Sequence, residues 1–159
     1  MAEKNKILVV DDEDALRTVL SAELEGEGYK VSSAGDGAEA INILKGQSFD
    51  LILLGMGDNG HTASLFPGLA AVTETVRWVM ALYVEVAGMW RVTMTPVIIN
   101  AARQVAFLVS GAQKADVLQR VLEGPHQPVV LPSQIIKPAT GELHWLVDAP
   151  AAAKLKRDL

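Results

Sequence analysis

The 159-residue chain has the length and composition of a globular domain, and its charge argues against several classes of partner. Half of its residues are hydrophobic and 21% are charged, which argues against disorder. A net charge of −5, without clusters of Lys or Arg, disfavours nucleic acid and anionic membranes as partners. The absence of cysteine excludes disulfides and thiolate metal sites and agrees with a cytoplasmic location, while the composition leaves an oligomer open.

The chain carries no pattern that divides it into separate folding units. Its first apolar run, residues 7–10, is too short for a signal-peptide core or a membrane span. We find no internal repeat, low-complexity tract or charge block that would mark a linker. We therefore expect a single domain over residues 1–159.

The first third of the chain alternates short apolar runs with amphipathic segments. Apolar residues recur at three- and four-residue spacing after Asp14, and Gly26 and Gly28 provide stop signals for that helix. This order predicts parallel strands joined by right-handed crossovers. The expected strands span residues 7–10, 29–33 and 51–54, and the expected helices span residues 14–27 and 37–45.

The remainder of the chain continues the mixture of strands and helices. Pro96 opens a helix, and Gly124 with Pro125 stops another. We therefore predict an α/β fold, a three-layer α/β/α sandwich with a mostly parallel sheet of the flavodoxin-like or Rossmann-like type. The expected strands span residues 78–84, 90–95, 105–109 and 143–147, and the expected helices span 96–103, 113–122 and an Ala-rich terminal segment.

Two adjacent carboxylates, Asp11 and Asp12, follow the first predicted strand. Ligands in such sheets bind at the carboxyl ends of the strands, so this pair could hold Mg²⁺ if a neighbouring strand supplied a third oxygen ligand. The same acids could instead cap the next helix and favour its positive end. We favour helix capping and expect no cofactor, with Mg²⁺ as the alternative.

Together, ILVVDDE, the helix that follows it and FDLILL resemble the response-regulator receiver family over residues 6–54. The resemblance implies a Mg²⁺-dependent phosphoacceptor aspartate directly after Leu54, where this chain has Gly55. Glycine offers neither a nucleophile nor a metal ligand. We therefore expect phosphorelay chemistry to be lost from this receiver-like segment, residues 1–54.

A glycine-rich turn follows the third predicted strand and carries a histidine. Glycines at positions 55, 57 and 60 let the backbone approach a ligand closely, and His61 lies at the end of the turn. A neutral imidazole at this position could serve as a general base. The spacing alone is equally compatible with a structural histidine and with Thr62 as a helix cap.

Five ordered motifs resemble the 6-phosphogluconolactonase family over residues 50–155: LLGMGDNGHTASLFPG, WRVTMTP, INAAR, FLVSGAQKA and GELHWLVD. The resemblance implies metal-free hydrolysis of the δ-lactone of a phosphorylated sugar acid, with His61 at the position of the active-site histidine. Amides of the glycine turn or a cation would stabilise the oxyanion. His126 and His144 have no such supporting pattern and are interpreted as structural or exposed.

The substrate phosphate, or a phosphate or sulfate ion, would need fixed cations, and the candidates that match the family are Arg91 and Lys114. Arg91 alternates with Thr93 and Thr95 on one face of a predicted strand, which could line a cleft or face solvent. Lys114 follows Ser110 and Gly111 near a predicted helix start, where an anion could bind, although exposed lysines are common there.

The chain also departs from the lactonase pattern. The family's early Gly/Ser-rich phosphate loop and its acidic-arginine motif have no counterpart upstream of the glycine turn, and Asn59 stands where related enzymes commonly carry aspartate. We interpret the chain as an engineered chimera, joined within residues 51–54, that folds without native activity. The alternative is a residual lactonase or sugar-phosphate binder that uses His61.

Overall fold

The computed structural model describes residues 5–10, 14–35, 37–46 and 51–156. The chain divides into two compact units, Met1–Ile52 and Leu53–Leu159, and each is described by itself. Within the described residues, every helix is too short or too polar to cross a membrane.

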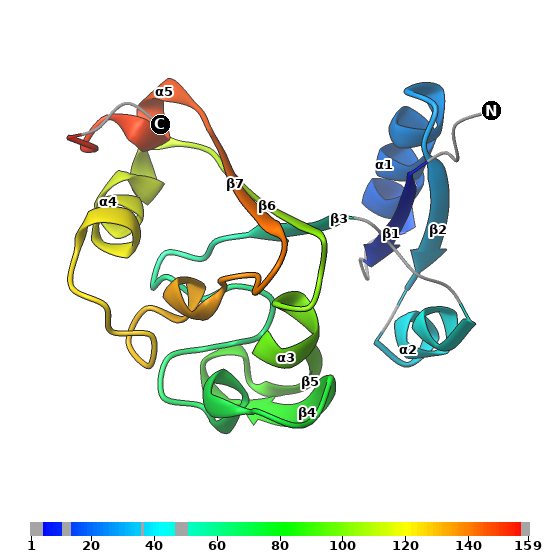
Figure 1. Ribbon diagram of the computed structural model, residues 1–159, viewed down its shortest axis with the longest axis horizontal. Helices are drawn as coiled ribbons and strands as arrows, with labels where there is room; N and C mark the ends of the chain where they lie inside the picture. Colours follow the sequence, from blue (N-terminus) through cyan, green and yellow to red (C-terminus); the bar gives the residue numbers. More distant parts are fainter. Residues whose placement is uncertain (1–4, 11–13, 36, 47–50, 157–159) are drawn as a thin grey trace. The chain divides into compact units, whose positions relative to one another are not determined.

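The first unit is built from two parallel strands and two helices (Figure 1). Strands β1 (Lys6–Val10) and β2 (Lys30–Ala34) pair in parallel register, from Lys6 opposite Lys30 to Val10 opposite Ala34. Helices α1 (Asp14–Gly26) and α2 (Gly37–Gly46) lie within two residues of their predicted limits. Parallel pairing across α1 confirms the strand-helix-strand order read from the sequence.

Helix α1 ends through a glycine in the left-handed conformation. The φ angle of Gly28 is +93°, which a residue without a Cβ adopts readily. The amide of Tyr29 then donates to the carbonyl of Leu24 at 3.1 Å and turns the chain into β2. Asp11 and Asp12 lie outside the described residues, and within the described ones we find no group of three or more His, Cys, Asp or Glu side chains suited to a metal ion.

The second unit centres on a sheet of order β3-β6-β7, made of β3 (Leu51–Gly55), β6 (Gln104–Val109) and β7 (Glu142–Val147). Strands β6 and β7 are parallel. Phe107 of β6 lies opposite Trp145 of β7, and their rings stack with centroids 4.1 Å apart. This pair extends the buried core.

Helix α4 (Ala115–Glu123) supplies apolar side chains to the same core. Val117 and Leu118 are buried on the helix, as are Val105 and Val109 on β6. The predicted helix over 113–122 is thus found, except that its first turn is the 3-10 helix η3 (Ala112–Lys114). The terminal helix α5 (Ala149–Ala152) contacts α4 and η3 (Figure 1).

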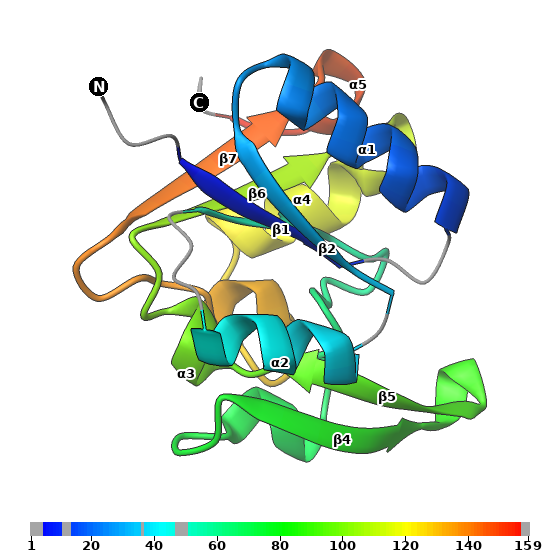
Figure 2. The ribbon, with the colours of Figure 1, turned by 90° about the vertical axis from the view of Figure 1, so that its right-hand side faces the viewer.

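Strands β4 (Val79–Val84) and β5 (Met89–Met94) form a separate antiparallel hairpin (Figure 2). The connection is the short 3-10 helix η2 (Glu85–Ala87), followed by Gly88 with φ +63°. Parallel strands need a crossover of a dozen or more residues, which four residues cannot provide. The hairpin is therefore the antiparallel exception in a mostly parallel fold.

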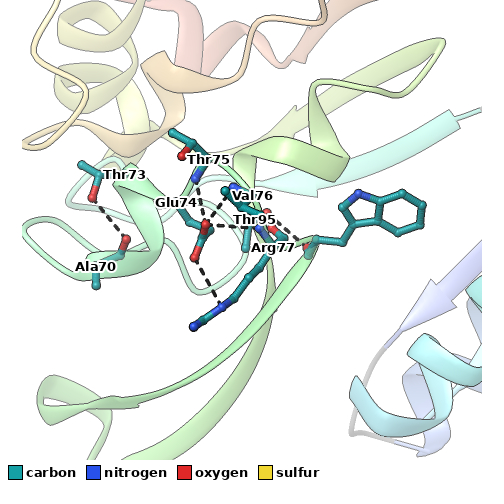
Figure 3. A network of polar contacts seen from close by, with 8 residues as sticks. Ala70, Thr73, Glu74, Thr75, Val76, Arg77 and Thr95 are labelled. Carbon is teal, nitrogen blue, oxygen red and sulfur yellow. Dashed lines mark hydrogen bonds and ion pairs between the residues drawn. The ribbon is translucent and has the colours of Figure 1, made fainter.

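A polar network fixes the start of this hairpin (Figure 3). The Oε1 atom of Glu74 accepts hydrogen bonds from the amides of Thr75, Val76 and Arg77 at 2.9, 2.8 and 3.2 Å. These charge-assisted bonds lower the pKa of Glu74. The hydroxyl of the buried Thr95 donates to the carbonyl of Arg77 at 2.5 Å, and its amide donates to the carbonyl of Trp78 at 2.9 Å, which ties the end of the hairpin to its beginning. The 3-10 helix η1 (Ala70–Thr73) precedes the network.

Helix α3 (Pro96–Ile99) is shorter than the sequence predicts. The expectation of a helix to Arg103 is wrong because Asn100 forms tertiary hydrogen bonds instead. Its Nδ2 atom donates to the carbonyl of Ile135 at 3.0 Å, and its Oδ1 accepts the amide of Lys137 at 2.7 Å. The 3-10 helix η4 (Pro132–Ile135) is thereby joined to the end of α3.

Candidate active site

The glycine-rich turn after β3 is closed by its own backbone hydrogen bonds. The amide of Gly57 donates to the carbonyl of His61 at 2.8 Å, and the amide of Gly60 donates to the carbonyl of Gly57 at 2.9 Å. Gly60 has φ +76°, which favours glycine at this position. The amides of this turn were expected as possible oxyanion donors, but those of Gly57 and Gly60 are engaged within the turn.

Side chains from elsewhere in the second unit hold the turn in place. The hydroxyl and the amide of Ser133 both donate to the carbonyl of Gly60 at 2.9 Å. The hydroxyl of Thr62 donates to the carbonyl of Gly55 at 2.8 Å. Ser133 and Thr62 are buried, so these three bonds are shielded from water. Thr62 therefore closes the turn rather than capping a helix.

The imidazole of His61 is fixed on three sides. Its Nδ1 atom lies 2.6 Å from the Oδ1 atom of Asn59. Its ring stacks on Phe66 with centroids 4.1 Å apart and an interplanar angle of 21°. It also packs against Gly57, where an added Cβ atom would lie 2.0 Å from the Cε1 atom of His61. Gly57 is therefore required to make room for this ring.

The contact with Asn59 determines which imidazole nitrogen is basic. The Oδ1 atom of Asn59 also faces the backbone amide of His61 at 3.2 Å. An amide can only donate, so the Asn59 atom that it meets must be the oxygen. The Nδ1 atom of His61 must then carry the proton, which leaves the lone pair on Nε2. Asn59 thus orients the imidazole without a carboxylate charge.

The surroundings of His61 keep it neutral near pH 7. Burial lowers the pKa of His61 below its usual value, and the positive charges of Lys114 and Arg91 lower this pKa further. The carboxylate of Asp58 opposes this shift. The turn, Arg91 and Lys114 therefore form one electrostatic group around the imidazole.

Lys114 forms an ion pair with Asp58, which belongs to the glycine-rich turn. The side chain of Lys114 is only 19% exposed, whereas that of Asp58 is 77% exposed. The hydrogen bond from Lys114 is the main reason that the pKa of Asp58 is lowered. The sequence analysis did not select Asp58, because only the fold brings it to a residue 56 positions away.

Asp148 holds the loop that precedes Lys114. Its carboxylate accepts the hydroxyl of Ser110 at 2.7 Å and the amide of Gly111 at 3.0 Å, and it caps α5 by accepting the amide of Ala151 at 2.8 Å. These bonds lower the pKa of Asp148, with the Ser110 hydroxyl as the main cause. Sequence reasoning missed Asp148, although an acid before Ala-Pro is a recognisable helix N-cap.

Arg91 is exposed on β5, two residues before the buried Thr93. The hydroxyl oxygen of Thr93 accepts the amide of Ser64 at 3.0 Å. This bond connects the strand that carries Arg91 to the segment directly after His61. Arg91 and Thr93 alternate onto one side of the strand, and the positive charge of Arg91 lowers the pKa of His61.

The other two histidines lie elsewhere. The Nε2 atom of His144 lies 3.3 Å from the Oε2 atom of Glu142, and both side chains are exposed on β7. His126 is exposed and lines a surface depression with Trp145. Both placements agree with the structural or exposed roles expected for them.

Residues 9–145 match the family model described as glucosamine-6-phosphate isomerases/6-phosphogluconolactonase. A 6-phosphogluconolactonase of Synechocystis is 44% identical over 109 residues, which cover 69% of this chain and 44% of the relative. A probable chloroplastic 6-phosphogluconolactonase 3 of Oryza sativa subsp. indica is 34% identical over 149 residues, which cover 89% of this chain and 45% of the relative.

A solved structure of 6-phosphogluconolactonase from Trypanosoma cruzi superposes with a TM-score of 0.60 at 34% identity, covering 69% of this chain and 42% of the other. This likeness confirms the predicted α/β class with a mostly parallel sheet, consistent with a three-layer sandwich. The chain spans less than half the length of these relatives.

The matches also correct the interpretation of the chain as an engineered chimera without activity. The family model begins at residue 9 and continues through the predicted join at residues 51–54, and the Oryza relative aligns with 89% of the chain. These findings give no support to a receiver segment over residues 1–54, and they make the chimera interpretation wrong. The chain belongs to the glucosamine-6-phosphate isomerase/6-phosphogluconolactonase family.

Proposed function

We propose that this chain hydrolyses the lactone of a phosphorylated sugar acid, as a carboxylic ester hydrolase of the 6-phosphogluconolactonase type. The observation that carries the proposal is the neutral His61, whose Nδ1 is held by Asn59 and whose environment includes two cations. The similarity to lactonases of Synechocystis and Oryza supports the same reaction.

In the proposed reaction, His61 acts as a general base through Nε2. A water molecule attacks the lactone carbonyl carbon while Nε2 takes its proton, and the carbonyl oxygen becomes an oxyanion. The intermediate then collapses, the bond between the carbonyl carbon and the ring oxygen breaks, and the imidazolium returns its proton to that oxygen. One water is consumed, and the product is the open-chain acid.

Arg91 and Lys114 would supply the positive charge that this substrate needs. Their charges both act on His61, so an anion bound by them would lie beside the imidazole. One cation can bind the phosphate while the other stabilises the oxyanion. With the amides of Gly57 and Gly60 engaged in the turn, we assign oxyanion stabilisation to a cation.

The direct test is hydrolysis of 6-phosphogluconolactone by the wild type and by His61→Ala, with the spontaneous rate subtracted. We expect wild-type turnover and a loss of about 100-fold or more in kcat for the variant. His144→Ala is the matched control, because His144 is an exposed histidine paired with Glu142, and it should retain full activity. Turnover that persists in His61→Ala would refute the assigned base.

A sugar-phosphate binder is the second candidate, favoured by the two cations whose charges act on His61. Calorimetric titration with 6-phosphogluconate separates the two functions. Saturable binding without turnover would favour the binder. The absence of both binding and turnover would reject both functions.

A further inference from the structure

We infer that Asp58 competes with phosphorylated ligands for Lys114. The carboxylate of Asp58 forms an ion pair with the lysine, and a ligand phosphate must displace this carboxylate in order to bind. The inference rests on the proposed function, since it assigns Lys114 to the ligand phosphate. It makes Asp58 a residue that limits the affinity of the site for phosphorylated ligands.

The two partners of this ion pair are anchored very differently. The side chain of Lys114 is 19% exposed, so the surrounding protein restricts where its Nζ atom can reach. The side chain of Asp58 is 77% exposed, so its carboxylate can rotate into water at little cost. The lysine is therefore the fixed member of the pair, and the aspartate is the one that can leave.

A ligand phosphate and the Asp58 carboxylate would compete for the same charge. Both are anions that accept from the Lys114 ammonium, and holding both close together brings negative charges into contact. A dianionic phosphate group attracts the lysine more strongly than one carboxylate does. Inorganic sulfate and phosphate esters, which are dianions, should thus displace Asp58, whereas a sugar acid without phosphate should not.

Removal of the Asp58 charge should therefore tighten binding. We expect Asp58→Asn to bind 6-phosphogluconate about three- to tenfold more tightly than the wild type in a calorimetric titration at low salt, and this gain should shrink as salt screens the pair. Gluconate, which lacks the phosphate and does not displace Asp58, should gain less affinity from the substitution than 6-phosphogluconate does, so the preference for the phosphorylated ligand should widen.

Asp116→Asn is the matched control. Asp116, on α4, is about as exposed as Asp58 and forms an ion pair with Lys154, and its loss should leave the affinity unchanged. The double variant Asp58→Asn, Lys114→Met should lose the gain, because the gain acts through the lysine.

Equal or weaker binding by Asp58→Asn would overturn the inference, since it would mean that Asp58 positions Lys114 for the ligand. Failure of Asp58→Asn to bind either 6-phosphogluconate or inorganic phosphate would overturn it as well. Tighter phosphate binding by Asp58→Asn without lactone hydrolysis by the wild type would uphold the competition and reject only the hydrolase function.

Discussion

The Oδ1 atom of Asn59 lies 2.6 Å from Nδ1 of His61 and also accepts the backbone amide of His61 at 3.2 Å. One oxygen therefore closes the turn and selects the imidazole tautomer. Since Asn59 carries no charge, it orients the imidazole of His61 without raising its pKa.

Replacing Asn59 with aspartate should move the acid limb of the pH-rate profile to higher pH. The added carboxylate would stabilise the imidazolium and raise the pKa of His61, so a higher pH would be needed to form the neutral base. Asn59→Leu should instead lower kcat about tenfold or more, because the tautomer and the ring orientation are lost. An unchanged acid limb in Asn59→Asp would contradict the assigned contact.

Gly57→Ala should inactivate the site without unfolding the chain. The new Cβ would lie 2.0 Å from Cε1 of His61, so the ring must move, and a displacement of about 1 Å costs about 100-fold in rate. Gly55→Ala is the matched control, since a Cβ at Gly55 meets no atom within 4 Å. Steady-state kinetics of the two variants tests the prediction, and equal activities would count against it.

Thr93→Val should destabilise the second unit by about 1–3 kcal/mol, because it leaves the buried amide of Ser64 without its acceptor. Urea denaturation followed by circular dichroism measures this free energy of unfolding. The control Thr73→Val removes an exposed hydroxyl bonded to the carbonyl of Ala70 at 3.3 Å, and it should change stability by about 0.5 kcal/mol or less. An unchanged free energy of unfolding in Thr93→Val would show that this bond does not stabilise the link between β5 and the turn.

Lys114→Met should raise KM about tenfold, Arg91→Met should lower kcat about tenfold or more, and both should move the acid limb of the pH-rate profile to higher pH. The kinetic losses reflect a lost charge-assisted hydrogen bond to the phosphate and a lost charge beside the oxyanion. The shift of the limb follows because both cations lower the pKa of His61, so losing either one raises it. Arg120→Met, which removes an exposed charge on α4, should change none of these quantities. A kinetic loss without a shift of the limb would place the cation away from His61.

Asp148→Asn should lower the melting temperature at pH 7 by a few degrees, and the difference from the wild type should vanish in acid. The pKa of Asp148 is lower in the folded than in the unfolded state, so its charge stabilises the fold above a pH of about 4. That contribution is lost as the pH falls through the folded-state pKa. Thermal unfolding between pH 3 and pH 7 measures the effect, and a constant difference would refute the role of the charge.

Local pattern was sufficient to predict most strands and to single out the glycine turn with its histidine. Buried apolar runs gave β6 and β7 to within one residue, because a strand buried on its core face leaves a distinct signal in sequence. The end of α3 was missed because the side chain of Asn100 bonds to residues 35 and 37 positions away, which no local preference encodes.

The chimera interpretation failed for a related reason. The short strand patterns before Gly55 are shared by many α/β folds, so a resemblance over residues 6–54 carries less information than a family match that extends over residues 9–145. A parallel α/β segment can resemble several families at once.

The sequence by itself determined the α/β class, the glycine turn with its histidine, and two basic residues worth examining, because periodicity and glycine placement are local properties. Only the tertiary structure decided that Asp58 meets Lys114, that Asp148 holds the loop before it, and that Asn59 presents its oxygen to Nδ1 of His61. These contacts depend on distances between segments far apart in the chain, or on side-chain orientation within a turn. Packing fixes both.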